Sequence, residues 1–237
     1  MNLKIKTLFL IGSVVISIIL SSCKKDENNE PVITTQIPDV TGQTGSFIDD
    51  RDDKTYHYIG IGTQFWMMEN LAYVDSGIQH ITDNSEWEDN IDYDGWCYYE
   101  DSVNNGSTYG VLYQWKAAKI ACPSGWHLPT YDEWTTLINS LGGDNIAGGK
   151  MKEEGTAHWN SPNVDATNTS NFSALPSGRH FYRGSFDGLG NYGYYWCDTE
   201  FNSYSAYSIL LGFDYANTNV HLDGKKLNGL AVRCVKD

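Results

Sequence analysis

The chain has 237 residues, a formal net charge of −14 and an aromatic content of 14%. An acidic surface repels phosphate backbones, and this excludes nucleic acid as an expected partner. A hydrophobic fraction of 41% beside a charged fraction of only 19% excludes a largely disordered protein.

The first 22 residues are typical of a secretory signal peptide. Lys4 and Lys6 form a basic start, and the apolar run 8–20 is shorter than the roughly 20 residues that a membrane-spanning helix needs. A short anchor that stays attached is the alternative. Residues 20–23, LSSC, resemble the lipobox of bacterial lipoproteins. This resemblance implies cleavage before Cys23 and acylation of Cys23, which gives the protein a lipid anchor to a membrane.

Residues 23–45 are predicted to be the acylated cysteine and a flexible tether, because they are polar, contain two prolines and lack periodicity. The basic-then-acidic run 24–30 resembles the export tag of surface lipoproteins of the Bacteroides group, which implies display at the cell surface, on the outer face of the outer membrane. The remaining residues, 46–237, suffice for one domain with its own core.

The first half of this domain predicts strands and then a helix. Residues 46–74 are typical of strands, with an aspartate-rich turn at 50–54. Residues 75–95 are polar and are predicted to form a long surface loop. Residues 107–119 are expected to form a helix, although Gly110 weakens its start.

The strongest local pattern predicts a helix over 131–141. Thr130 and Glu133 have the spacing of a capping box, in which each side chain satisfies a backbone N–H group at the helix start. Four apolar residues then form one stripe: Trp134, Leu137, Ile138 and Leu141. The pair Gly142-Gly143 is typical of a helix end.

The second half predicts an irregular region and then a sheet. Residues 142–171 are rich in glycine and asparagine and lack periodicity. From 171 onward, short aromatic β runs alternate with turn residues, and Asp223-Gly224 predicts a hairpin turn between the last two. Strands, two helices, an irregular middle and a closing antiparallel sheet indicate an α+β domain.

The segment CPSGWHLPTYDEW, 122–134, raises the question of catalysis. His127 could serve as a base for Cys122, but exported chains usually pair their cysteines, so we favour a structural histidine that is hydrogen-bonded to backbone. Besides Cys23, the chain has Cys97, Cys122, Cys197 and Cys234. Four cysteines allow three disulfide connectivities, and their spacing does not indicate a zinc site.

Six segments together resemble the Fibrobacter succinogenes major paralogous domain. They are IGTQFWMMENL (61–71), TYGVLYQWKAA (108–118), CPSGWHLPTYDEW (122–134), AGGKMKEEGTAHWNSPN (147–163), FSALPSGRH (172–180) and GLAVRCVKD (229–237). The resemblance implies a fold similar to C-type lectins and formylglycine-generating enzymes: two helices packed on a twisted, loop-rich antiparallel β region. The chain departs from the family pattern at Asp53 and Lys54 in the first turn, and at Cys197.

The lectin-like layout implies that the element after Cys122 packs on the last strand, which favours a Cys122–Cys234 disulfide and leaves Cys97–Cys197 as a second pair. Formylglycine-generating enzymes hold copper through paired cysteines. This chain does not pair free cysteines in that way, so we expect neither that activity nor a cofactor.

Acidic residues are numerous, but their spacing singles out no catalytic pair. Calcium candidates lie in two aspartate-rich stretches, 49–53 and 92–94. An aspartate-rich hairpin turn is more often only a turn, so we expect no metal site.

The region 179–225 combines tyrosines with arginine, asparagine and glycine, a composition suited to a binding face. The ligand-binding candidates are Arg179, Tyr182, Arg183, Tyr192, Tyr194, Tyr204 and Tyr207. We therefore expect a non-catalytic surface lipoprotein that binds glycan, fibre or another surface protein in adhesion. The alternatives are a structural envelope lipoprotein without a soluble ligand, and an enzyme on a formylglycine-enzyme-like scaffold.

Overall fold

The structure is a computed structural model that describes residues 37–74, 77–90 and 92–237, without the side chains of 221–223. The predicted signal peptide, Cys23 and the tether as far as residue 36 lie outside the described residues. Within the described part of the chain, no helix has the length and apolar character needed to cross a membrane.

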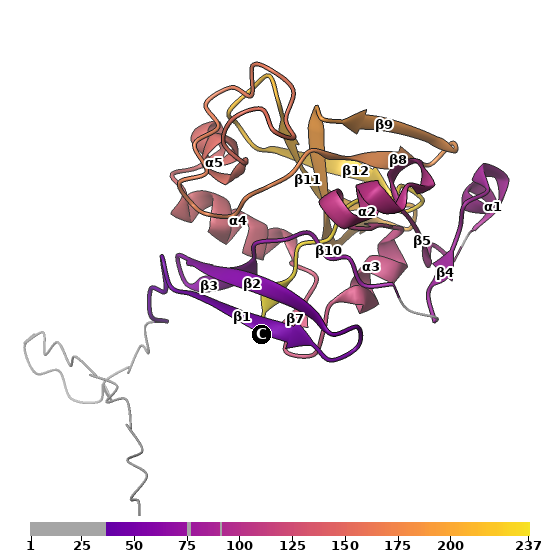
Figure 1. The fold of residues 1–237 in the computed structure, drawn as a ribbon, viewed down its shortest axis with the longest axis horizontal. Coiled ribbons are helices and arrows are strands. Elements are labelled where there is room, and N and C mark those ends of the chain that lie inside the picture. The colour runs from indigo at the N-terminus through magenta and orange to yellow at the C-terminus, as the bar shows by residue number, and fades with distance from the viewer. Residues whose placement is uncertain (1–36, 75–76, 91) are drawn as a thin grey trace, which may run out of the picture. The chain divides into compact units, whose positions relative to one another are not determined.

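The first sheet joins the two ends of the domain (Figure 1). Its strand order is β1-β2-β3-β13-β7. The strands are β1 (Thr44–Asp49), β2 (Lys54–Ile61), β3 (Gln64–Met67), β13 (Val235–Lys236) and β7 (Trp126–His127). The predicted turn at 50–54 connects β1 to β2. The fold includes residues before the predicted start at 46, since the Val40 amide donates to the Gly62 carbonyl oxygen at 2.7 Å.

The described residues contain five α-helices, so the expectation of two is wrong. The helices are α1 (Asn84–Asp89), α2 (Val103–Tyr109), α3 (Trp115–Ala121), α4 (Tyr131–Ser140) and α5 (Asp144–Met151), with a short 3-10 helix at Tyr99–Asp101. The predicted helix over 107–119 is divided because Gly110, at φ 82°, ends α2. The predicted loop 75–95 contains α1, which is anchored by the fully buried Trp87.

The glycine-rich helix α5 lies in the region without periodicity, and its sequence has no apolar stripe that would predict a helix. Its glycines instead allow close backbone packing: a Cβ atom at Gly148 would lie 2.6 Å from the Asn217 carbonyl oxygen. By contrast, α4 confirms the capping-box prediction, since Thr130 and Glu133 exchange the two expected bonds. The buried side of α4 contains Trp134, Leu137 and Ile138.

The second sheet has the order β12-β11-β10-β8-β9. Its strands are β8 (Ser177–Phe181), β9 (Ser185–Leu189), β10 (Tyr192–Asn202), β11 (Ser205–Gly212) and β12 (Asn219–Lys225). A third, small sheet contains β4 (Gln79–His80), β5 (Gly95–Cys97) and β6 (Leu112–Tyr113). Helices and mainly antiparallel sheets make the domain α+β.

The predicted hairpin turn at Asp223-Gly224 is wrong, because β12 continues through it and Gly224 pairs with Ala206 of β11. Only glycine fits there. A Cβ atom at Gly224 would lie 2.9 Å from the Ala206 carbonyl oxygen and 3.1 Å from the Trp196 ring. The glycine of this dipeptide therefore allows close packing of β12 on its neighbours, and the chain does not reverse direction there.

Candidate functional site

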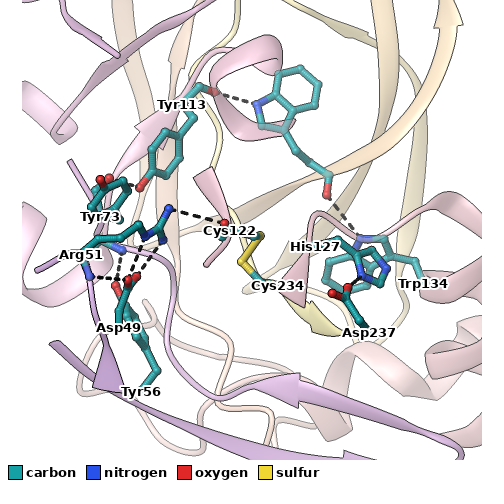
Figure 2. Close-up of a disulfide and its surroundings, with 12 residues drawn as sticks. Asp49, Arg51, Tyr56, Tyr73, Tyr113, Cys122, His127, Trp134, Cys234 and Asp237 are labelled. Carbon is teal, nitrogen blue, oxygen red and sulfur yellow. Dashed lines mark hydrogen bonds and ion pairs between the residues drawn. A yellow bond between two sulfur atoms is a disulfide. The ribbon is translucent and has the colours of Figure 1, made fainter. Parts of the chain in front are cut away.

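A disulfide joins Cys122, at the end of α3, to Cys234, just before β13. The Cα atoms are 6.0 Å apart and the sequence separation is 112 residues. This pairing confirms the expectation from the family resemblance, and Figure 2 shows the bridge between the two elements. A sulfur atom in a disulfide is not a thiolate, so Cys122 in this state is not a nucleophile.

The aspartate-rich turn between β1 and β2 contacts the disulfide region through Arg51 (Figure 2). Both oxygens of the buried Asp49 carboxylate accept hydrogen bonds from the Arg51 guanidinium, at 2.8 and 2.7 Å. Burial acts to raise the pKa of Asp49, but the hydrogen bonds and charge of Arg51 outweigh it and lower that pKa. Arg51 also lies 3.6 Å from the centroid of the Tyr73 ring and donates to the Cys122 carbonyl oxygen at 3.4 Å. In the described residues, no group of three or more His, Cys, Asp or Glu is placed to hold a metal ion.

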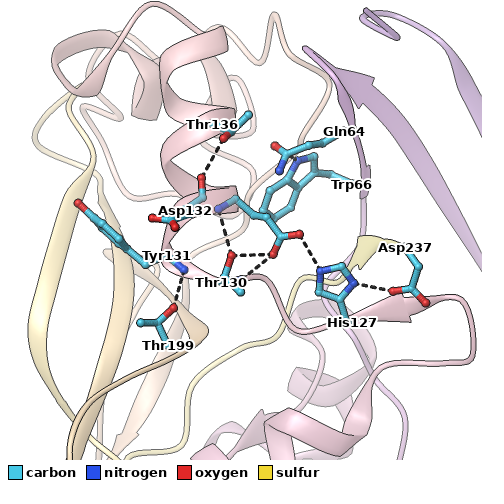
Figure 3. Close-up of polar contacts among 10 residues, drawn as sticks. Gln64, Trp66, His127, Thr130, Tyr131, Asp132, Thr136, Thr199 and Asp237 are labelled. Carbon is cyan, nitrogen blue, oxygen red and sulfur yellow. Dashed lines mark hydrogen bonds and ion pairs between the residues drawn. The ribbon is translucent and has the colours of Figure 1, made fainter. Parts of the chain in front are cut away.

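The side-chain partners of His127 are two carboxylates, and not the backbone groups that were expected. Nδ1 lies 2.6 Å from Asp237 Oδ1, and Nε2 lies 2.8 Å from Glu133 Oε1 (Figure 3). The other Glu133 oxygen accepts from the Thr130 amide at 2.8 Å, so one carboxylate serves both the helix cap and the histidine. Burial acts to lower the pKa of His127, but these two partners outweigh it and raise that pKa. A positive imidazolium that donates to two carboxylates is a link between β7, α4 and the C-terminus.

We predict that this link makes stability depend on pH. The pKa of His127 is raised in the folded state, so its contribution is complete below the unfolded pKa and is lost as pH rises through the folded pKa. The melting temperature of the wild type should therefore exceed that of His127→Asn by more at about pH 6 than at about pH 9. Asp237→Asn, which removes one partner, should reduce this pH dependence. A difference that does not vary with pH would contradict the assignment.

The predicted Cys97–Cys197 pair is wrong: both cysteines are free and buried. Cys97 lies in a cluster with Trp87 and Tyr99, whereas Cys197 belongs to a different cluster that contains Trp134 and Tyr195. Burial raises the pKa of both thiols well above the ordinary value. Both cysteines are therefore small core residues with protonated thiols at neutral pH.

A pocket of about 240 Å³ opens on the second sheet, and we call it the polar pocket. Its lining comes from β8, the turn after β8, β10, β11, β12 and the segment after β12: Arg179, Phe181, Tyr182, Tyr194, Ser208, Gly224, Lys225, Asn228 and Leu230. Arg179 is held by two hydrogen bonds to Asp187 of β9, at 2.9 and 3.1 Å. The guanidinium carbon also lies 4.8 Å from the Tyr194 ring centroid. Burial raises the pKa of Tyr194 to about 12, so its hydroxyl group is a neutral hydrogen-bonding group.

A second pocket of about 230 Å³, which we call the tyrosine pocket, adjoins the first. Its lining residues are Tyr93, Tyr182, Tyr204, Lys225 and Leu227. Tyr182 and Lys225 line both pockets. The Tyr182 amide donates to Asn228 Oδ1 at 2.9 Å, which fixes this shared wall. We call these two pockets, which share Tyr182 and Lys225, the groove.

Four of the seven predicted ligand-binding residues line this groove: Arg179, Tyr182, Tyr194 and Tyr204. The other three lie outside both pockets. Arg183 is exposed beside the Tyr182 ring. Tyr192 packs against Tyr194 and Phe213, and Tyr207 packs against Tyr131 and Phe201.

Sequence reasoning missed Tyr93, Lys225 and Asn228. Tyr93 belongs to the predicted loop 75–95, and Lys225 follows the mistaken hairpin turn. Their place in the groove depends on contacts between distant segments, for which the local sequence pattern gives no signal. The aromatic content of 179–225 was the only useful local indication.

The model of the Fibrobacter succinogenes major domain family matches residues 59–236, which is more than half of the chain. No curated protein and no solved structure matches the chain.

Proposed function

This chain belongs to the Fibrobacter succinogenes major domain family, and we propose that its domain is a non-catalytic binding module that takes a glycan in the groove. The observation that carries this proposal is the lining of the two adjoining pockets. Four tyrosine rings, a fixed guanidinium, a hydroxyl-bearing serine and an amide line the two adjoining pockets. Sugars present both apolar ring faces and many hydroxyl groups, and such a lining offers a partner for each.

The proposal includes a C-type-lectin-like arrangement. Two features support it: the first strands and the last strand share one sheet, and the disulfide fastens the end of α3 beside that last strand. The groove lies on the other large sheet, away from the bridge. We propose that the first sheet and its disulfide form a rigid support, and that the second sheet provides the binding surface.

We further propose that the module is held at the cell surface, on the outer membrane, through acylated Cys23. The LSSC motif and the charged run 24–30 support this location. Metabolic labelling with a palmitate analogue should label the wild-type protein but not Cys23→Ser, which should be released from the membrane fraction. An unlabelled wild-type protein would contradict the anchor.

We predict that Tyr182→Ala weakens glycan binding by about tenfold, the upper range for loss of one stacked aromatic contact. The measurement is binding of the purified full chain to an array of immobilised oligosaccharides, followed by titration of the strongest ligand. Tyr207→Ala is the matched control, because its ring is partly buried but lies outside both pockets.

The melting temperature of Tyr182→Ala should stay close to that of the wild type. Failure of the wild type to bind any oligosaccharide in a saturable manner would overturn the glycan proposal. That result would favour a structural envelope role.

A further inference from the structure

Lys225 occupies the junction of the groove. Its side chain is exposed, lines both pockets and has no ion-pair partner among the side chains that the structure describes. The neighbouring Lys226 differs in every respect. It is 4% exposed, pairs with Glu200, and donates to the Ser203 carbonyl oxygen at 3.1 Å. Lys226 therefore stabilises the fold through its buried contacts, whereas the charge of Lys225 is available to a ligand in the groove.

Arg179 adds a second cationic group to the polar pocket. Asp187 occupies its Nε and Nη2 atoms. The remaining nitrogen, Nη1, has no hydrogen-bond partner among the described residues, and a guanidinium has five N–H donors to place. One unpaired ammonium, and one guanidinium that is paired with Asp187 but keeps a free nitrogen, thus line the groove of a protein whose net charge is −14. Positive charge concentrated on an acidic protein selects ligands with a negative group at that point.

The dimensions of the groove indicate a ligand longer than one sugar. Each pocket, at about 240 and 230 Å³, is smaller than the roughly 300–1,000 Å³ typical of sites for drug-sized ligands, whereas the two together fall within that range. Tyr182 forms the shared wall, and Tyr93 and Tyr204 lie beyond it. Adjacent pockets that share one wall suit consecutive units of a chain.

We propose that the groove binds an acidic oligosaccharide of at least two units, with a uronate carboxylate placed on Lys225. This inference rests on the proposed glycan-binding function and specifies its ligand class. One unpaired ammonium at the junction matches one carboxylate, and the aromatic rings on either side pack on the faces of the two flanking sugar units. A bond between a carboxylate and a charged donor contributes more than a neutral one, so the carboxylate sets the preference.

The test is calorimetric titration of the full chain with three ligands. The first is a galacturonic acid oligomer, and the second is its methyl ester, which has the same sugars without the charge. The third is an oligomer of neutral sugars that carries sulfate groups. The acid should bind at least about tenfold more tightly than the ester, in line with a charge-assisted bond. Added salt should reduce this difference. Lys225→Gln should abolish the difference between acid and ester, whereas Lys236→Gln, which removes an exposed lysine from β13, should preserve it.

Equal binding of acid and ester would overturn the carboxylate inference while the glycan proposal stands. Tighter binding of the sulfated oligomer than of the acid would overturn it in favour of another anion. An absence of binding to all three oligomers would overturn the inference, and the oligosaccharide array then decides the glycan proposal separately. Acid selectivity that persists in Lys225→Gln would show that Lys225 is not the residue responsible.

Discussion

Removal of the disulfide by Cys122→Ala together with Cys234→Ala should lower the free energy of unfolding by about 4–5 kcal/mol. The bridge spans 112 residues, and a crosslink that closes a loop of this length removes much conformational freedom from the unfolded chain. Urea denaturation at neutral pH measures the effect. Wild-type protein treated with a reductant under the same conditions should show a similar loss.

The matched control is Cys97→Ala together with Cys197→Ala, which removes the two buried free thiols. Each of these changes should cost on the order of 1 kcal/mol, as for an ordinary point substitution, and a reductant should leave the wild-type side chains at these positions unaffected. Equal losses in the two double variants would show that the bridge contributes no more than core packing does.

Trp134→Ala should lower the free energy of unfolding by about 3–5 kcal/mol, because it removes a large ring from a close-packed core. Trp134 is completely buried, and its ring centroid lies 4.7 Å from that of Trp66 and 5.8 Å from that of Tyr195. Its indole nitrogen donates to the Trp196 carbonyl oxygen at 3.4 Å. The ring therefore joins the first sheet, α4 and the second sheet.

Thr136→Ala is the control for Trp134→Ala, because Thr136 lies on the exposed side of the same helix (Figure 3). Its replacement should change stability by no more than about 0.5 kcal/mol. Chemical denaturation followed by tryptophan fluorescence and by circular dichroism provides both measurements. A loss below about 1 kcal/mol for Trp134→Ala would mean that the surrounding core closes over the cavity.

The sequence by itself determined the elements whose signals are local. The capping box at Thr130 and Glu133 predicted α4, since both partners lie within one helical turn. The aspartate-rich turn at 50–54 predicted the first hairpin for the same reason. The pairing of Cys122 with Cys234 is a long-range feature, and it was found through the family resemblance and not through any local pattern.

Only the tertiary structure decided the features that depend on which distant segments meet. His127 and Asp237 are 110 residues apart, and Cys97 and Cys197 are separated because they belong to different core clusters. Lys225 reaches the groove because Gly224 packs against Ala206 and Trp196 and carries β12 past the expected turn. A turn dipeptide expresses a backbone preference worth about 1 kcal/mol or less. Burial of the surrounding core stabilises the protein by far more than this, so core packing overrides the turn preference and decides the path of β12.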